Sequence, residues 1–168
     1  RRVLFRSNES DGSYEEFKLA LLYVNRKLAR MMASDGEGAT ALMEVSVTGA
    51  ATREDARTLA KSVITSSLTK AAIYGHDANW GRILCALGYA GVDFDQKKVD
   101  ITVKSRVGEI LLVKDGMQAD YSEEEAKDIL SEDEVTILCD MHSGGAIATA
   151  WGCDLSLEYV KINADYRS

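Results

Sequence analysis

Within Asp35-Gly-Glu-Gly-Ala-Thr-Ala-Leu-Met-Glu-Val-Ser-Val-Thr48 the hydrophobic pattern changes from helical to extended, and this change is the strongest indication of the fold. Ahead of it, apolar residues recur every three or four positions, which predicts an amphipathic helix ending near Asp35-Gly36; they are Phe17, Leu21, Val24, Leu28 and Met31. From Met43 onward apolar and polar residues alternate, which predicts a half-buried strand. The connecting turn therefore joins a helix to a strand.

That turn places Glu37 between Gly36 and Gly38. Glycine allows a backbone to approach a ligand closely, so the carboxylate can be presented to an ammonium group. Glycine also ends helices in a left-handed conformation, and a solvated helix-to-strand turn explains the same residues. The spacing alone favours the turn and leaves both interpretations open.

The other elements are predicted from capping and periodicity. Helices are expected after the capping residues Thr52 and Ser122 and as two short pieces broken at 75–77, the second spanning 79–88. Strands are expected at 99–103, 109–113, 135–139, 146–150 and 155–162. Because helices and strands interleave without a regular βαβ alternation, we predict an α/β (α+β) layered sandwich with a mixed or mostly antiparallel sheet.

Composition limits the function. The 168 residues are 46% apolar and 28% charged, with a net charge of −7, which is typical of a soluble globular protein. No basic stripe and no long apolar run appear, so we expect neither nucleic-acid nor membrane binding. Three separated cysteines and two histidines lack metal-ligand spacing, so we expect a reducing, cytoplasmic location and no metal.

Several polar residues are weaker candidates for chemistry. Thr40 is a poor nucleophile without a free N-terminal amine as its base, and a role at the start of the strand explains it better. His76-Asp77 is better explained by Asp77 or Asn79 capping the next helix. Cys139 and His142 form a possible nucleophilic pair, but the two side chains need not face each other.

The chain ends in Trp151-Gly-Cys-Asp-Leu-Ser-Leu-Glu-Tyr-Val-Lys-Ile-Asn-Ala-Asp-Tyr-Arg-Ser168. Its tyrosines and apolar residues indicate a tail that is tied down. Asn163 and Ser168 carry groups that can donate hydrogen bonds to a carboxylate. The simpler alternative is an edge strand with a frayed end.

Four segments together resemble the ornithine acetyltransferases, the bifunctional glutamate N-acetyltransferases of arginine biosynthesis. They are 35–40, 77–83, 86–95 and 151–168, in the family's order. The similarity runs from about Tyr14 to Ser168. It implies that 8–168 is the C-terminal part of the family's β-chain, while residues 1–7 look like an unrelated leader.

The resemblance implies an acyltransferase that moves acetyl from N-acetylornithine to glutamate, some members also accepting acetyl-CoA, with no bound cofactor. The family precursor cleaves itself, and the new N-terminal threonine is the nucleophile. No catalytic residue is expected here, because that threonine and the oxyanion hole would lie upstream. The expected partners are the α-chain and the remainder of the β-chain, in an assembly of two α and two β chains.

The resemblance assigns three substrate-binding residues, namely Glu37, Asn163 and Ser168. Glu37 would hold the substrate ammonium, while Asn163 and Ser168 would grip its carboxylate end, so we expect Glu37 and Asn163 to border one cleft. We also expect exposed apolar surface where the missing part would pack. The alternative function is a non-catalytic amino-acid-binding regulatory module that uses the same acidic loop, and a Cys139/His142 enzyme ranks third.

Overall fold

A computed structural model describes residues 12–165 of the chain. Its elements, in chain order, are α1 (Gly12–Ser34), β1 (Leu42–Ala50), α2 (Arg53–Thr65), α3 (Ser67–Tyr74), α4 (Trp80–Gly88), the 3-10 helix η1 (Gln96–Lys98), β2 (Asp100–Ser105), β3 (Gly108–Lys114), β4 (Met117–Gln118), α5 (Glu123–Leu130), β5 (Glu134–Asp140), β6 (Ala146–Cys153) and α6 (Leu157–Asp165).

The strands form a six-stranded sheet in the order β4-β3-β2-β5-β1-β6. β1 runs parallel to β5, with Val45 opposite Ile137, and every other neighbouring pair is antiparallel. The parallel pair is possible because a long connection with several helices separates β1 from β5. The predicted α/β class with a mixed, mostly antiparallel sheet is confirmed.

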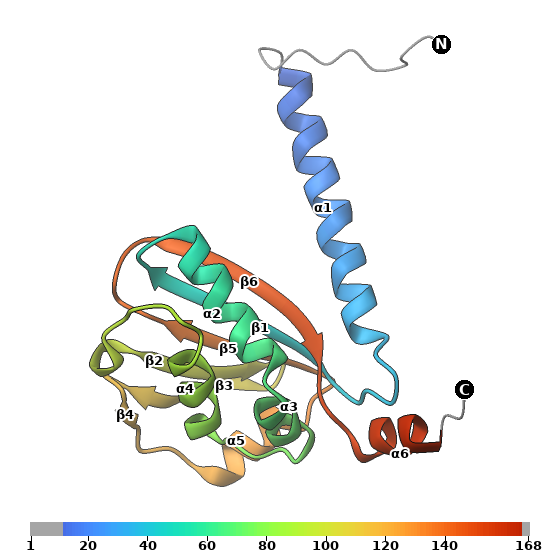
Figure 1. Ribbon diagram of the computed structural model, residues 1–168, viewed down its shortest axis with the longest axis vertical. Coiled ribbons are helices and arrows are strands. Elements are labelled where there is room, and N and C mark those ends of the chain that lie inside the picture. The colour runs from blue at the N-terminus through green and yellow to red at the C-terminus, as the bar shows by residue number, and fades with distance from the viewer. Residues whose placement is uncertain (1–11, 166–168) are drawn as a thin grey trace.

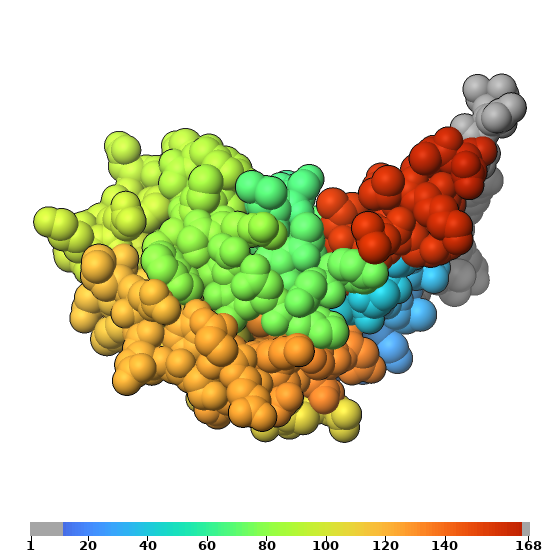
Figure 2. Space-filling view, turned by 90° about the horizontal axis from the view of Figure 1, so that it is seen from below, coloured from blue at the N-terminus to red at the C-terminus, as the bar shows by residue number. Residues whose placement is uncertain are grey.

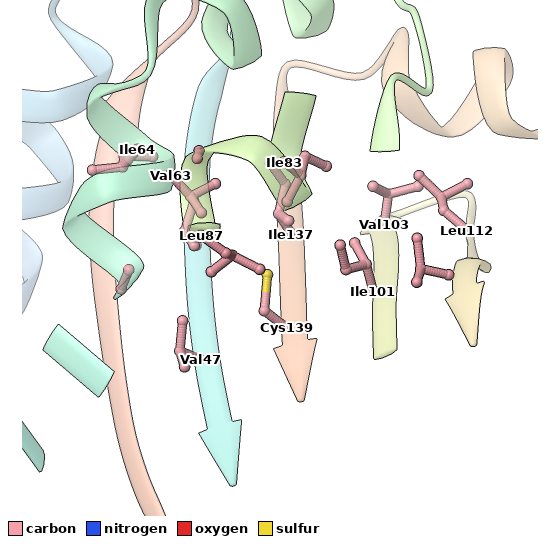
Figure 3. Packing of buried hydrophobic residues seen from close by; sticks show 14 of the residues in the cluster. Val47, Val63, Ile64, Ile83, Leu87, Ile101, Val103, Leu112, Ile137 and Cys139 are labelled. Atoms are coloured by element: carbon pink, nitrogen blue, oxygen red, sulfur yellow. The ribbon is translucent and has the colours of Figure 1, made fainter. Parts of the chain in front are cut away.

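The core lies between one face of the sheet and the helices that cover it. Alternate residues of β1 and β5 point into it, among them Val47 and Cys139, and α2 and α4 contribute Val63 and Leu87 from the other side (Figure 3). All four side chains are fully buried. The alternation predicted for β1 therefore reflects one buried face.

Helix caps agree with the predicted boundaries of α2, α4 and α5. The Thr52 hydroxyl accepts a hydrogen bond from the Asp55 N–H at 3.1 Å, and the Asn79 side chain accepts one from the Arg82 N–H at 3.2 Å. Asn79, one of the two candidates, is therefore the cap of α4. Ser13 and Glu16 also have the spacing of a capping box ahead of the first helix. In the structure α1 begins at Gly12, so Ser13 lies inside the helix and not ahead of it.

Helix α1 projects away from the sheet and its covering helices (Figure 1). None of its described residues is buried. Arg30 ties its last turns to the sheet, with Nη1 2.9 Å from Glu44 Oε2 and Nη2 2.9 Å from Glu134 Oε2. The predicted amphipathic helix exists, but its apolar face finds no core within the described residues.

The prediction of an extended segment at 155–162 is wrong, because residues 157–165 form α6. The alternation of Leu155, Leu157 and Tyr159 is typical of a strand, but Ser156 caps a helix there. Its hydroxyl accepts a hydrogen bond from the Tyr159 N–H at 3.1 Å. Such a cap satisfies a donor that the start of a helix would otherwise leave open.

Candidate functional site

The glycine-rich loop at 36–41 is fastened to the segment that follows β6. The Asp154 carboxylate accepts hydrogen bonds from the backbone N–H groups of Thr40, at 2.9 Å, and Ala41, at 3.3 Å, and from the Thr40 hydroxyl. In return the Asp154 N–H donates to the Ala41 carbonyl at 3.1 Å. Asp154 is 3% exposed, so its buried charge is stabilised by these donors.

A second fastening joins the same loop to the start of α6. The Ser156 hydroxyl donates to the Gly38 carbonyl at 2.5 Å while it caps α6. Gly38 has φ +65°, and a Cβ at this position would lie 2.7 Å from the Tyr159 backbone nitrogen. Only glycine permits this approach. In Figure 2 the red tail accordingly lies against the green and cyan segments.

These contacts bring Glu37 and Asn163 together, although they lie 126 positions apart in the chain. Asn163 Nδ2 donates to Glu37 Oε2 at 2.7 Å and to the Tyr159 carbonyl at 2.9 Å. Both N–H groups of the Asn163 amide are therefore used. Among the described residues nothing donates to Glu37 Oε1, so one carboxylate oxygen remains available to a ligand.

Glu37 borders a cavity of about 360 Å³ between the loop, α3 and the start of α6. Its lining residues are Gly36, Glu37, Thr65, Ser67, Lys70, Cys153, Asp154, Leu155 and Tyr159. The volume suits a small metabolite. The lining residues combine an available carboxylate with a lysine and three hydroxyl-bearing side chains, so the cavity can bind a small molecule that carries both charges.

Ser168 lies outside the described residues, so its role at the carboxylate end of the substrate stays a prediction. Within residues 12–165 no three His, Cys, Asp or Glu side chains are grouped so that they could hold a metal ion. In the same range no helix has the length and hydropathy needed to cross a bilayer.

The Cys139/His142 pair does not form a nucleophilic site. Complete burial raises the pKa of the Cys139 thiol to about 12, which disfavours the thiolate. The His142 ring instead faces two carboxylates, with Nε2 3.0 Å from Asp100 Oδ2 and Nδ1 3.7 Å from Asp140 Oδ1. The third-ranked function is therefore excluded on geometry.

Asp100 is the centre of a cluster of polar groups that includes Lys114, Asp115 and His142. Burial raises the pKa of its carboxyl, but hydrogen bonds from Lys114 Nζ, the Asp115 N–H and His142 outweigh burial and lower the pKa to about 2. The Lys114 contact is 2.6 Å and the Asp115 contact 2.8 Å. The cluster joins β2, the β3–β4 turn and the β5–β6 loop.

Comparison with known proteins identifies the family of the chain. The model of the ArgJ family matches residues 3–168. The chain belongs to the ArgJ family. The match includes residues 3–7, part of the segment that the sequence set apart as a leader.

Two ArgJ-family relatives illustrate the similarity. The arginine biosynthesis bifunctional protein ArgJ of Caldanaerobacter subterraneus subsp. tengcongensis is 53% identical over 160 residues, covering 94% of this chain and 40% of that protein. The glutamate N-acetyltransferase of Methanocaldococcus jannaschii is 49% identical over 156 residues, covering 90% of this chain and 39% of that protein. The chain thus spans about two fifths of the length of these relatives.

A solved ArgJ structure shares the fold. The crystal structure of the arginine biosynthesis bifunctional protein ArgJ of Bacillus halodurans superposes with a TM-score of 0.89 at 44% identity. The match covers 95% of this chain and 74% of that chain. The resemblance inferred from the four sequence segments is confirmed.

Sequence reasoning missed three residues that build the ArgJ cavity. Asp154 and Ser156 hold the loop in place, and the capping pattern Ser156-Leu-Glu-Tyr159 is the signal that could have identified α6. Lys70 lies within a helix whose apolar pattern gave no sign of a site. Only the packing of α3 against the tail reveals it.

Proposed function

We propose that the chain is the C-terminal part of the β-chain of an ornithine acetyltransferase, which transfers acetyl from N-acetylornithine to glutamate in arginine biosynthesis. Membership of the ArgJ family supports this, as do relatives named as a bifunctional arginine-biosynthesis protein and a glutamate N-acetyltransferase. Some enzymes of this kind also take acetyl from acetyl-CoA, and the proposal includes acetyl-CoA as a second donor.

The observation that carries the proposal is the 2.7 Å hydrogen bond from Asn163 to Glu37 at the edge of the cavity. It orients the Glu37 carboxylate and leaves Oε1 for a substrate ammonium. The resemblance placed Asn163 at the carboxylate end, but both of its N–H groups are engaged. We therefore propose instead that Asn163 Oδ1 accepts a hydrogen bond from the same ammonium. We retain Ser168 as a third binding residue, at the carboxylate end of the substrate.

The nucleophile of the proposed reaction lies outside this chain. The Thr40 hydroxyl donates a hydrogen bond to the buried Asp154 carboxylate, so its role is to hold the loop in place. We propose that a threonine upstream, freed at a self-cleavage site, takes acetyl as an ester and releases ornithine. The glutamate amine then attacks that ester, with the threonine's own free amine as base. This chain supplies binding groups and no reacting atom.

The proposed partners are the α-chain and the preceding part of the β-chain, in an assembly of two α and two β chains. Helix α1 supports this, because its apolar side chains stay exposed: 47% for Leu21, 48% for Val24 and 51% for Leu28. Exposed apolar surface of this extent marks an interaction site. We propose that the rest of the protein covers it.

The test compares the 168-residue chain with the full-length parent in an acetyl-transfer assay from N-acetylornithine to glutamate. The parent is expected to turn over, with an acetyl group on an upstream threonine detected by mass spectrometry. The chain alone is expected to be inactive because it lacks the nucleophile. Turnover by the chain alone, with acetyl on Thr40, would contradict the proposal.

A further inference from the structure

Lys70 lines the same cavity as Glu37, and both ends of its backbone are fixed. Its N–H donates to the Ser66 carbonyl at 2.9 Å within α3, and its carbonyl accepts the Leu155 N–H at 3.3 Å. The side chain is half-buried. The backbone of Lys70 is therefore fixed by α3 and by the tail segment, and the residue lines the cavity.

Among residues 12–165 the Lys70 ammonium has no ion pair and no hydrogen bond. Asp154, the buried carboxylate of the cavity, is already satisfied by Thr40 and Ala41. The cavity thus contains a cation that no described carboxylate neutralises.

Asn163 cannot supply the donor that a substrate carboxylate needs. Its two N–H groups go to Glu37 and to the Tyr159 carbonyl, so only its carbonyl oxygen remains, and that oxygen repels a carboxylate. Of the charged groups that line the cavity, Lys70 is the cation. The cavity therefore has an acidic edge at Glu37 and a basic group at Lys70.

We infer that Lys70 binds the carboxylate of the amino-acid substrate while Glu37 and Asn163 bind its ammonium. The inference rests on the proposed function and adds the group that recognises the other end of the substrate. Two opposite charges, one at each end, fix the orientation of a small zwitterion in a cavity of about 360 Å³. The same arrangement rejects an amine that lacks the carboxylate.

The test uses the full-length parent and two acetyl donors, N-acetylornithine and its decarboxylated analogue N-acetylputrescine. In Lys70→Met we expect kcat/KM for N-acetylornithine to fall about 10- to 100-fold, the range for a lost hydrogen bond to a charged group. The kcat/KM for N-acetylputrescine should stay unchanged, because it has no carboxylate to lose. Lys70→Arg should restore most of the preference.

Lys127, an exposed lysine of α5, provides the matched control, and Lys127→Met should behave as the wild type. Equal losses on both donors in Lys70→Met would show a purely structural role and overturn the inference. An active parent whose donor preference survives Lys70→Met also overturns it. A parent that binds ornithine, more weakly in Lys70→Met, yet transfers no acetyl contradicts the proposed function alone.

Discussion

Gly38 is the residue that most tightly constrains the candidate site. Its positive φ and the absence of a Cβ let the loop lie directly on the start of α6, because a Cβ at Gly38 would come within 2.7 Å of the Tyr159 nitrogen. Glu37 precedes it and Asn163 follows on α6, so the Glu37–Asn163 hydrogen bond depends on this approach. The site is thus set by backbone packing as much as by its side chains.

Gly38→Ala should therefore destabilise the chain by about 1–3 kcal/mol through the left-handed backbone alone. The clash with the Tyr159 backbone should also displace α6. Urea unfolding gives the stability, and hydrogen exchange of the α6 amides reports the displacement. Gly88→Ala is the control, because no atom lies within 4 Å of a Cβ there and it should cost nothing. Equal stability of Gly38→Ala and wild type would contradict this account.

At the scale of elements, local signals predicted most helices and strands and failed at the tail. The capping residues of α2 and α5 are short-range features, so the sequence reveals them. The prediction for the tail was wrong because the same few residues carry two signals. Their alternating pattern is typical of a strand, while Ser156 can cap a helix. The strand propensity of these residues is overridden by the hydrogen bond between Ser156 and Gly38, which lie 118 positions apart.

Helix α1 makes a prediction about association. Leu28→Glu should change the unfolding free energy of the chain by no more than about 0.5 kcal/mol, because the side chain is already exposed. It should nevertheless lower the recovery of the upstream part of the protein that co-purifies after co-expression. Asn25→Glu, one turn away and also exposed, should leave recovery unchanged. If Leu28→Glu recovers as much of the upstream part as the wild type does, α1 is not the docking face.

At the scale of the whole molecule, the strand order could not be predicted from the sequence. The parallel pairing of β1 with β5 joins segments about 90 residues apart, and no local pattern encodes it. The site could not be predicted from local patterns either, since Glu37 and Asn163 were paired through resemblance to a family and not through periodicity. Lys70 was missed because its position depends on how α3 packs against the tail.

The cluster around Asp100 makes the unfolding free energy of the chain depend on pH in the acidic range. Because its pKa is about 2 in the folded chain against an ordinary value of 3.8, ionised Asp100 stabilises the fold above about pH 4. That stabilisation should be lost as the pH falls from about 4 to 2. Asp100→Asn should be less stable at pH 7 and should show a flatter decline in this window.

Denaturant unfolding at several pH values between 2 and 7 measures this dependence. Asp120→Asn, at an exposed aspartate, should keep the wild-type profile. A wild-type decline that persists in full in Asp100→Asn would assign the acid sensitivity to other carboxylates.

The role of Glu37 is tested by kcat/KM for N-acetylornithine in the full-length parent carrying Glu37→Gln. This change removes the charge and keeps the size of the side chain. If Glu37 holds the substrate ammonium, kcat/KM should fall about 10- to 100-fold, while Glu124→Gln at an exposed glutamate of α5 should have no effect. An unchanged kcat/KM in Glu37→Gln would reduce the loop to a helix-to-strand turn and contradict the account.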